Sequence, residues 1–156
     1  MNPIRKLAWV YAALFFGVVL LGYIPGATNA DGQLFGLFAI EPKDDLLHLA
    51  SGIWAGWAAW RSTRASVIYF KLFGSVYFLD GVLGLLVGQG ILDGGLLLYG
   101  PAALDLQTRI LANLPHLVIG GFAIWVGFVY SRKVADVPVP ADVPVPAIAP
   151  EPVDAP

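Results

Sequence analysis

The chain has 156 residues, of which 58% are hydrophobic and only 13% are charged. Soluble domains are about half apolar and a quarter charged, so this composition indicates a membrane protein. The net charge of −2 provides no basic field for nucleic acid, and the lack of cysteine excludes disulfides, thiolate metal sites and a cysteine nucleophile.

Four segments are candidate membrane-spanning helices, because about 20 mostly apolar residues cross the roughly 30 Å hydrocarbon layer. These spans are residues 7–24, 45–61, 65–89 and 110–131. The second is short and uses charged residues as its ends, and the third contains Lys71 and Asp80. The sequence therefore predicts an all-α integral membrane domain, residues 1–133, whose four transmembrane helices form two tandem hairpins.

The first span also has features of a secretory signal peptide. Arg5 and Lys6 precede an apolar core, and Thr28-Asn29-Ala30 could serve as a cleavage site. The apolar run of 18 residues, Leu7–Ile24, exceeds the usual signal-peptide core. We expect this segment to stay in the protein as a span, with cleavage as the open alternative.

The positively charged residues predict the orientation, since Lys and Arg are retained in short cytoplasmic segments. With the N-terminus inside, Lys43 and Arg109 fall outside, and seven cations fall on the cytoplasmic side: Arg5, Lys6, Arg61, Arg64, Lys71, Arg132 and Lys133. We therefore expect a multi-pass protein of the cell (inner) membrane with both termini in the cytoplasm.

The predicted outer loops, Asp31–Ile40 and Ile91–Leu104, are unusually apolar for loops. Backbone groups cannot stay in lipid without hydrogen-bond partners, so each loop needs a short helix or cover by other parts of the protein. We expect both to lie at the interface or to fold back over the bundle.

The C-terminal segment, residues 134–156, differs in composition from the rest. The sequence ADVPVP occurs twice in succession, and seven of the twelve prolines lie here. Such spacing of proline excludes helix and sheet and favours extended polyproline II structure. We expect a disordered cytoplasmic tail, which is either an inert extension or a docking motif.

Both histidines occur in the same short motif, Asp/Asn-Leu-x-His-Leu-x-x-Gly. The first copy is Asp45–Gly52 and the second is Asn113–Gly120. The shared frame suggests an internal duplication of one hairpin, with a pseudo-twofold axis along the membrane normal. It also predicts that His48 and His116 lie at similar depth near the outer face, with Asp45 and Asn113 capping the starts of their helices.

These motifs resemble the bacterial family known as domain of unknown function 4383. Its members have four membrane helices, an Asn/Asp-x-x-His-Leu-x-x-Gly motif that opens the second, a Tyr-rich third helix, and a Leu-x-His-Leu motif that opens the fourth. The third-helix feature corresponds here to Tyr69–Gly84, and the resemblance covers roughly residues 7–132. This chain has Asp45 where the family often has Asn. The resemblance implies a four-helix membrane fold and no particular activity.

Polar groups inside a bilayer are costly and tend to face the protein interior, so they are the candidate site residues. They are Asp80, Asp45, Asn113, His48 and His116. Two glycine pairs, Gly52 with Gly56 and Gly84 with Gly88, have the spacing of close helix contacts.

The sequence favours a structural or accessory subunit of a membrane complex, in which the histidines join helices by hydrogen bonds. Its expected partners are the lipid bilayer and other membrane subunits or further copies of itself. One alternative is a haem or (bacterio)chlorophyll protein that uses His48 and His116 as ligands. Another is a proton or cation relay that uses Asp80 with His48 and His116. Without a nucleophile elbow, phosphate loop or HExxH motif, we expect neither an enzyme nor a metal site.

Overall fold

The computed structural model describes residues 1–30, 33–36, 38–39 and 42–135. Its long helices are α1 (Pro3–Gly22), α2 (Pro42–Arg61), α3 (Thr63–Val87) and α5 (Leu106–Trp125). The shorter elements are β1 (Gln33–Leu34), β2 (Phe38–Ala39), α4 (Gly95–Tyr99), the π-helical turn η1 (Val126–Tyr130) and α6 (Ser131–Ala135).

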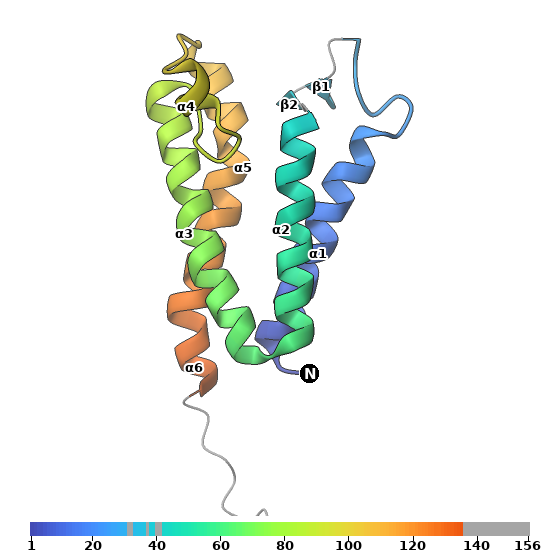
Figure 1. The fold of residues 1–156 in the computed structure, drawn as a ribbon, viewed down its shortest axis with the longest axis vertical. Helices are drawn as coiled ribbons and strands as arrows, with labels where there is room; N and C mark the ends of the chain where they lie inside the picture. Colours follow the sequence, from blue (N-terminus) through green and yellow to red (C-terminus); the bar gives the residue numbers. More distant parts are fainter. Residues whose placement is uncertain (31–32, 37, 40–41, 136–156) are drawn as a thin grey trace, which may run out of the picture.

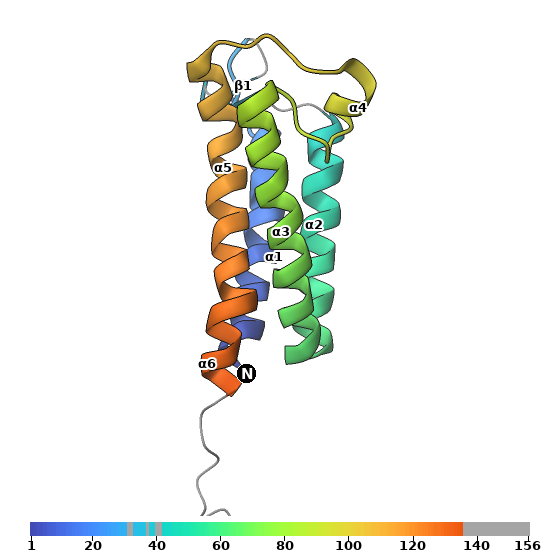
Figure 2. The ribbon, with the colours of Figure 1, turned by 90° about the vertical axis from the view of Figure 1, so that its left-hand side faces the viewer.

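The long helices lie side by side and alternate in direction (Figures 1 and 2). The N-terminus and α6 lie at one end of this bundle, which we call the base; β1, β2 and α4 lie at the other end, the crown. Helix α1 packs mainly against α2, and α3 packs mainly against α5 and η1. Contacts between the two hairpins are fewer and lie mostly between α2 and α3.

In the described part of the chain, three helices are long and apolar enough to cross a membrane. They are α1, α3 and the continuous helix from Leu106 to Val134. Helix α2 has the same length as α1 but is less apolar, because it contains Lys43, Asp44, Asp45 and Arg61. The helices therefore make this a membrane protein, whereas α2 does not qualify as a span by composition.

Capping residues fix where the long helices begin and end. The Asn2 side chain accepts a hydrogen bond from the Ile4 N–H at the start of α1, and the Ser62 hydroxyl accepts one from Ala65 N–H at the start of α3. Helix α3 ends at Gly88, whose φ of +80° is a left-handed conformation that glycine adopts without strain. At the base, Arg5 donates to the Ala59 and Trp60 carbonyls and so caps the end of α2.

The prediction that Asn113 caps the last long helix is wrong. Helix α5 already begins at Leu106, because the segment LQTRILAN contains no helix-breaking residue. Asp105 is the cap: its carboxylate accepts hydrogen bonds from the Thr108 N–H (3.0 Å) and hydroxyl (2.6 Å), and these bonds lower the pKa of Asp105. The helix therefore extends further toward the crown than the predicted span of residues 110–131.

The predicted outer loops form different structures. The segment Ile91–Leu104 contains the short helix α4, as expected. In the other segment, β1 and β2 form an antiparallel pair with Gln33 opposite Ala39. The predicted tail lies outside the described residues from residue 136 onward.

The centre of the bundle is an aromatic cluster contributed by α1 and α3. Its members are Tyr11, Phe15, Tyr69, Phe70, Phe73 and Tyr77. Their rings meet edge to face or offset, and the ring centroids of Phe73 and Tyr77 are only 4.2 Å apart. The Tyr11 hydroxyl donates to the Ile119 carbonyl (2.8 Å), which joins the two hairpins. The outer surface of the long helices is also apolar, with exposed side chains such as Leu20, Ile53, Leu86 and Val118. Such a surface suits contact with hydrocarbon.

Glycines let α3 and α5 approach each other closely. A Cβ atom on Gly120 would lie 2.5 Å from the Phe78 main-chain nitrogen, and one on Gly74 would lie 2.6 Å from that of Ile124. Both obstacles are backbone atoms, which cannot rotate away as a side chain can. The contact between these two helices therefore depends on the missing side chains.

We predict that Gly120→Ala lowers the free energy of unfolding by about 1–3 kcal/mol, because the added methyl group forces the two backbones apart. Denaturant unfolding in detergent micelles, followed by tryptophan fluorescence, measures this change. Gly17→Ala is the matched control, since nothing lies within 4 Å of a Cβ at that position. Equal stability of the two variants would contradict the close-contact account.

Candidate functional site

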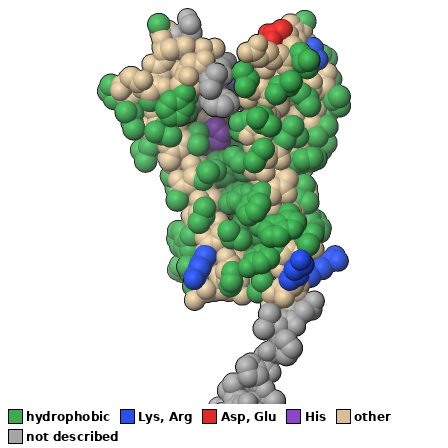
Figure 3. Space-filling model, turned by 180° about the vertical axis from the view of Figure 1, so that it is seen from behind, with side chains coloured by type: hydrophobic (Ala, Val, Ile, Leu, Met, Phe, Trp, Pro, Cys, Tyr) green, Lys and Arg blue, Asp and Glu red, His purple; other side chains and the backbone are tan. Residues whose placement is uncertain are grey.

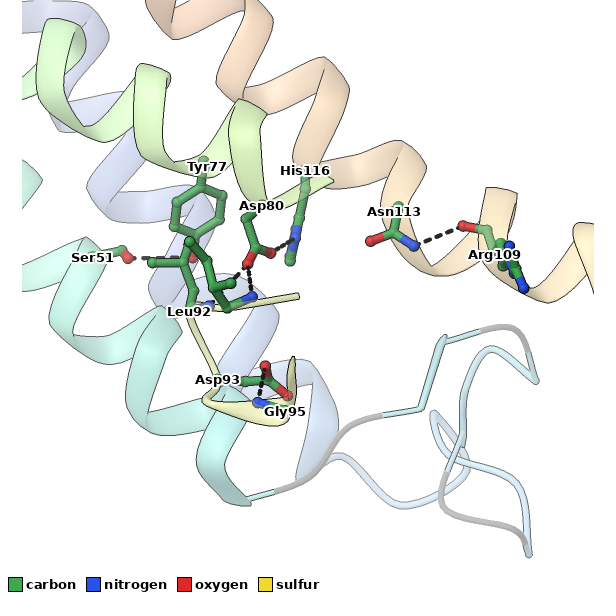
Figure 4. Close-up of polar contacts among 10 residues, drawn as sticks. Ser51, Tyr77, Asp80, Leu92, Asp93, Gly95, Arg109, Asn113 and His116 are labelled. Carbon is green, nitrogen blue, oxygen red and sulfur yellow. Dashed lines mark hydrogen bonds and ion pairs between the residues drawn. The ribbon is translucent and has the colours of Figure 1, made fainter. Parts of the chain in front are cut away.

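The most buried carboxylate among the described residues lies in the crown half of α3. Asp80 is only 2% exposed. Its Oδ1 accepts hydrogen bonds from the Ile91 N–H (2.6 Å) and the Leu92 N–H (2.9 Å), and its Oδ2 lies 2.8 Å from His116 Nδ1 (Figure 4). We call this group of four residues the Asp80 clamp.

The clamp depends on a chain reversal after α3. Gly88 ends the helix two turns beyond Asp80, and the chain then folds back until residues 91 and 92 reach the carboxylate. Gly90 makes this approach possible, because a Cβ there would lie 2.6 Å from Asp80 Oδ1. The clamp thus joins α3, α5 and the loop that leads to α4.

These donors explain how a carboxylate can lie inside a membrane bundle. An unpaired charge in that position is costly, whereas charge-assisted hydrogen bonds are among the strongest in proteins. Because a carboxylate has no proton to give, His116 donates through Nδ1–H, which leaves its Nε2 as the acceptor nitrogen. The His116 side chain stays 24% exposed, so this second nitrogen is on the less enclosed side.

The second histidine has different surroundings. The His48 ring stacks on Phe15, with centroids 5.8 Å apart, and its Nδ1 is buried without a hydrogen-bond partner among the described residues. One turn toward the crown, Asp45 Oδ2 accepts a hydrogen bond from the Tyr23 hydroxyl (2.8 Å). The other oxygen, Asp45 Oδ1, is buried and also has no partner in the described part of the chain.

Two aromatic rings connect the surroundings of the histidines. Tyr77 contacts the His116 ring edge to face at 5.1 Å and lies 5.7 Å from Phe15, on which His48 stacks. The Tyr77 hydroxyl also lies 3.3 Å from the Ser51 hydroxyl of α2. The structure therefore brings His116 and Asp80 into direct contact, while His48 stacks on Phe15. Ligation of a haem or chlorophyll by both histidines stays a prediction.

The remaining predicted residues lie at helix contacts. The Asn113 amide donates to the Arg109 carbonyl (2.8 Å), and its side chain occupies the space beside Gly84 that a Cβ would fill. Gly52 faces Phe15 and Phe16 of α1, where a Cβ would be 3.3 Å and 3.4 Å from them. Gly56 also faces α1, with more room, whereas Gly88 ends α3 instead of lying within it.

Sequence reasoning missed the main-chain donors of Ile91 and Leu92 and the contact glycines Gly74 and Gly127. Main-chain donors carry no side-chain signal. Gly120 was visible as the last residue of the second histidine motif, but its role was not. Among the described residues, no cluster of His, Cys, Asp or Glu has the three members that a metal ion would need.

We predict that Asp80 and His116 contribute to stability as a coupled pair. In a double-mutant cycle with Asp80→Ala and His116→Ala, the coupling free energy should be about 1–2 kcal/mol, since membrane-buried side-chain hydrogen bonds reach this range. His48→Ala combined with Asp80→Ala is the matched control and should be additive within about 0.5 kcal/mol. A coupling no larger for His116 than for His48 would show that the contact between Asp80 and His116 does not stabilise the fold.

Comparison with known proteins identifies one matching family. The model of the family described as "Domain of unknown function (DUF4383)" matches residues 5–103. This range includes α1 to α4, the first histidine motif and Asp80, but it ends before α5, so His116 lies outside it. No curated protein and no solved structure matches the chain. Because the match covers more than half of the sequence, the chain belongs to the DUF4383 family.

Proposed function

We propose that this chain is a four-span integral membrane protein of the cell (inner) membrane that serves as a structural or accessory subunit of a membrane complex. The fourth span in this proposal is α2. Its 20 residues would cover about 30 Å at 1.5 Å per residue, the thickness of the hydrocarbon layer. It also runs beside α1 for most of the height of the bundle (Figure 1).

The positions of the polar residues in α2 support this assignment. Lys43 and Arg61 are at its two ends, and Asp45 is 9% exposed and bonded to Tyr23. The surface of the helix instead presents Ile53, Trp57 and Trp60, which are exposed. The modest hydropathy of α2 therefore comes from its ends and its inward side, which membrane helices tolerate.

The distribution of cations supports a cytoplasmic base. Six of the nine Lys and Arg residues belong to the turns at the base: Arg5, Lys6, Arg61, Arg64, Arg132 and Lys133. Figure 3 shows blue side chains on both sides of the base, while Lys43 and Arg109 belong to the crown ends of α2 and α5. The positive-inside rule then puts both ends of the bundle core, residues 3 and 135, on the cytoplasmic side.

The Asp80 clamp is the observation that favours a structural role. Both oxygens of the carboxylate are already used by groups of the same chain, and the contacts hold the loop of α4 against α3 and α5. A carboxylate whose hydrogen bonds are satisfied in this way fixes the position of the α4 loop relative to α3 and α5. A rigid crown of fixed shape is what a subunit needs in order to present a constant surface to a partner.

We predict that mild-detergent extraction from native membranes yields this chain in a complex with another membrane protein at fixed stoichiometry. Chemical crosslinking in the membrane before extraction, followed by mass spectrometry, should report the same partner. The monomer of 16.6 kDa, or copies of this chain alone, in both experiments would contradict an accessory role.

A proton or cation relay is the second candidate, and the 2.8 Å contact between His116 and Asp80 favours it. Such a pair could pass a proton between imidazole and carboxylate. Purified protein in liposomes should then dissipate a proton gradient, and Asp80→Asn should abolish this flux. Equal flux with the native chain, Asp80→Asn and empty liposomes would exclude the relay.

A further inference from the structure

The seam between the two hairpins is the least tightly packed part of the bundle. Most helix contacts lie within each hairpin, and those between hairpins are largely made by α2 and α3. On the opposite side of the seam, a histidine side chain is visible in a recess of the surface (Figure 3). One of the two histidines thus reaches the surface of the bundle on this side.

The crown half of the bundle contains four polar side chains, which is unusual for the interior of a membrane bundle. Helix α2 contributes Asp45 and His48, three residues apart and so on one face of the helix. Helices α3 and α5 contribute Asp80 and His116. Asp45, His48 and Asp80 lie within about two turns of the crown ends of their helices, and His116 is ten residues into α5.

Two of these groups need hydrogen-bond partners that the described protein does not supply. Asp45 Oδ1 and His48 Nδ1 are both buried and unpartnered, on the same face of α2. A buried carboxylate oxygen without a donor is among the costliest arrangements in a folded protein. Small hydrogen-bonding molecules such as water offset this cost when the site is polar and connected to solvent.

The aromatic cluster borders these polar groups on the side of the base. Phe15, Phe73 and Tyr77 contact one another at centroid distances of 4.2–5.7 Å, and all three are buried. Below them the α2 residues facing the interior are Ala55, Ala58 and Ala59, which have no exposed surface. The polar row of α2 therefore runs from Asp45 and His48 only as far as Ser51, whose hydroxyl lies 3.3 Å from that of Tyr77 in the aromatic cluster.

From these observations we propose that the crown half of the bundle holds a hydrated crevice, reached from the outer side only, in which Asp45, His48 and His116 bind water. The aromatic cluster is its closed floor. The proposal goes beyond an accessory role and rests on the proposed orientation, with the crown outside.

Cysteine labelling tests this proposal directly, because the native chain contains no cysteine. The probe is the membrane-impermeant anion 2-sulfonatoethyl methanethiosulfonate, added to the outer side of sealed vesicles that contain the full-length chain. It reacts with thiolate, which forms in water and not in hydrocarbon. His48→Cys is the test variant, since it removes no hydrogen bond within the described residues.

Two control variants of α2 separate the crevice from lipid and from the packed core. Ala50 lies two residues after His48, so it is on the opposite side of α2, and it is exposed. Ala55 is fully buried beneath the crevice. We expect His48→Cys to react at least about 100-fold faster than Ala50→Cys and Ala55→Cys. Asp45→Cys should also react fast and provides a second test if His48→Cys does not elute as a folded monodisperse species.

Two further variants report the orientation independently. Ala103→Cys in the crown should react from the outside, and Lys133→Cys at the base should not. If both behave so while His48→Cys and Asp45→Cys stay as slow as Ala50→Cys, the crevice is disproved and the orientation stands. Reaction at Lys133→Cys and protection at Ala103→Cys would overturn the orientation and the outward opening together. Fast labelling of Ala55→Cys would disprove the closed floor.

Discussion

A carboxylate inside a membrane bundle needs donors, and the donors for Asp80 come from parts of the chain that would otherwise be independent. The Ile91 and Leu92 N–H groups can reach it only if α3 ends at Gly88 and the chain turns back. His116 can reach it only if α5 lies close against α3, which Gly120 and Gly74 allow. The cost of an unpaired charge in a low dielectric thus links the end of α3, the loop that carries Ile91 and Leu92, and the contact between α3 and α5.

The same arrangement accounts for the looser seam between the hairpins. Close glycine contacts hold α3 to α5, and Gly52 lets α2 approach Phe15 of α1, so each hairpin is well packed by itself. Across the seam the centre of the bundle is filled by aromatic rings, with one hydrogen bond from Tyr11 to Ile119. In the crown half the facing residues are polar, and their unsatisfied atoms favour water over further packing.

Hydrophobic length and the histidine motifs predicted much of this fold from the sequence. The long helices followed from the length of the apolar runs, the family from the histidine motifs, and the inward position of Asp80 from the cost of burying charge. The start of α5 was misplaced because the histidine motif suggested a helix start, whereas Asp105 is a stronger cap and lies outside the motif. The clamp could not be predicted, because two of its three donors are main-chain groups that any sequence provides. Which histidine meets Asp80 is likewise a matter of tertiary packing.

Backbone amide exchange at Ile91 and Leu92 tests the central claim most directly. If Asp80 holds these two N–H groups, they should exchange slowly in the native chain and much faster in Asp80→Ala. The Leu98 N–H, which bonds to the Gly94 carbonyl within the turn of α4, should change far less and is the internal reference. Fast exchange at Ile91 and Leu92 in the native chain, or exchange that Asp80→Ala does not alter, would contradict the clamp and the account built on it.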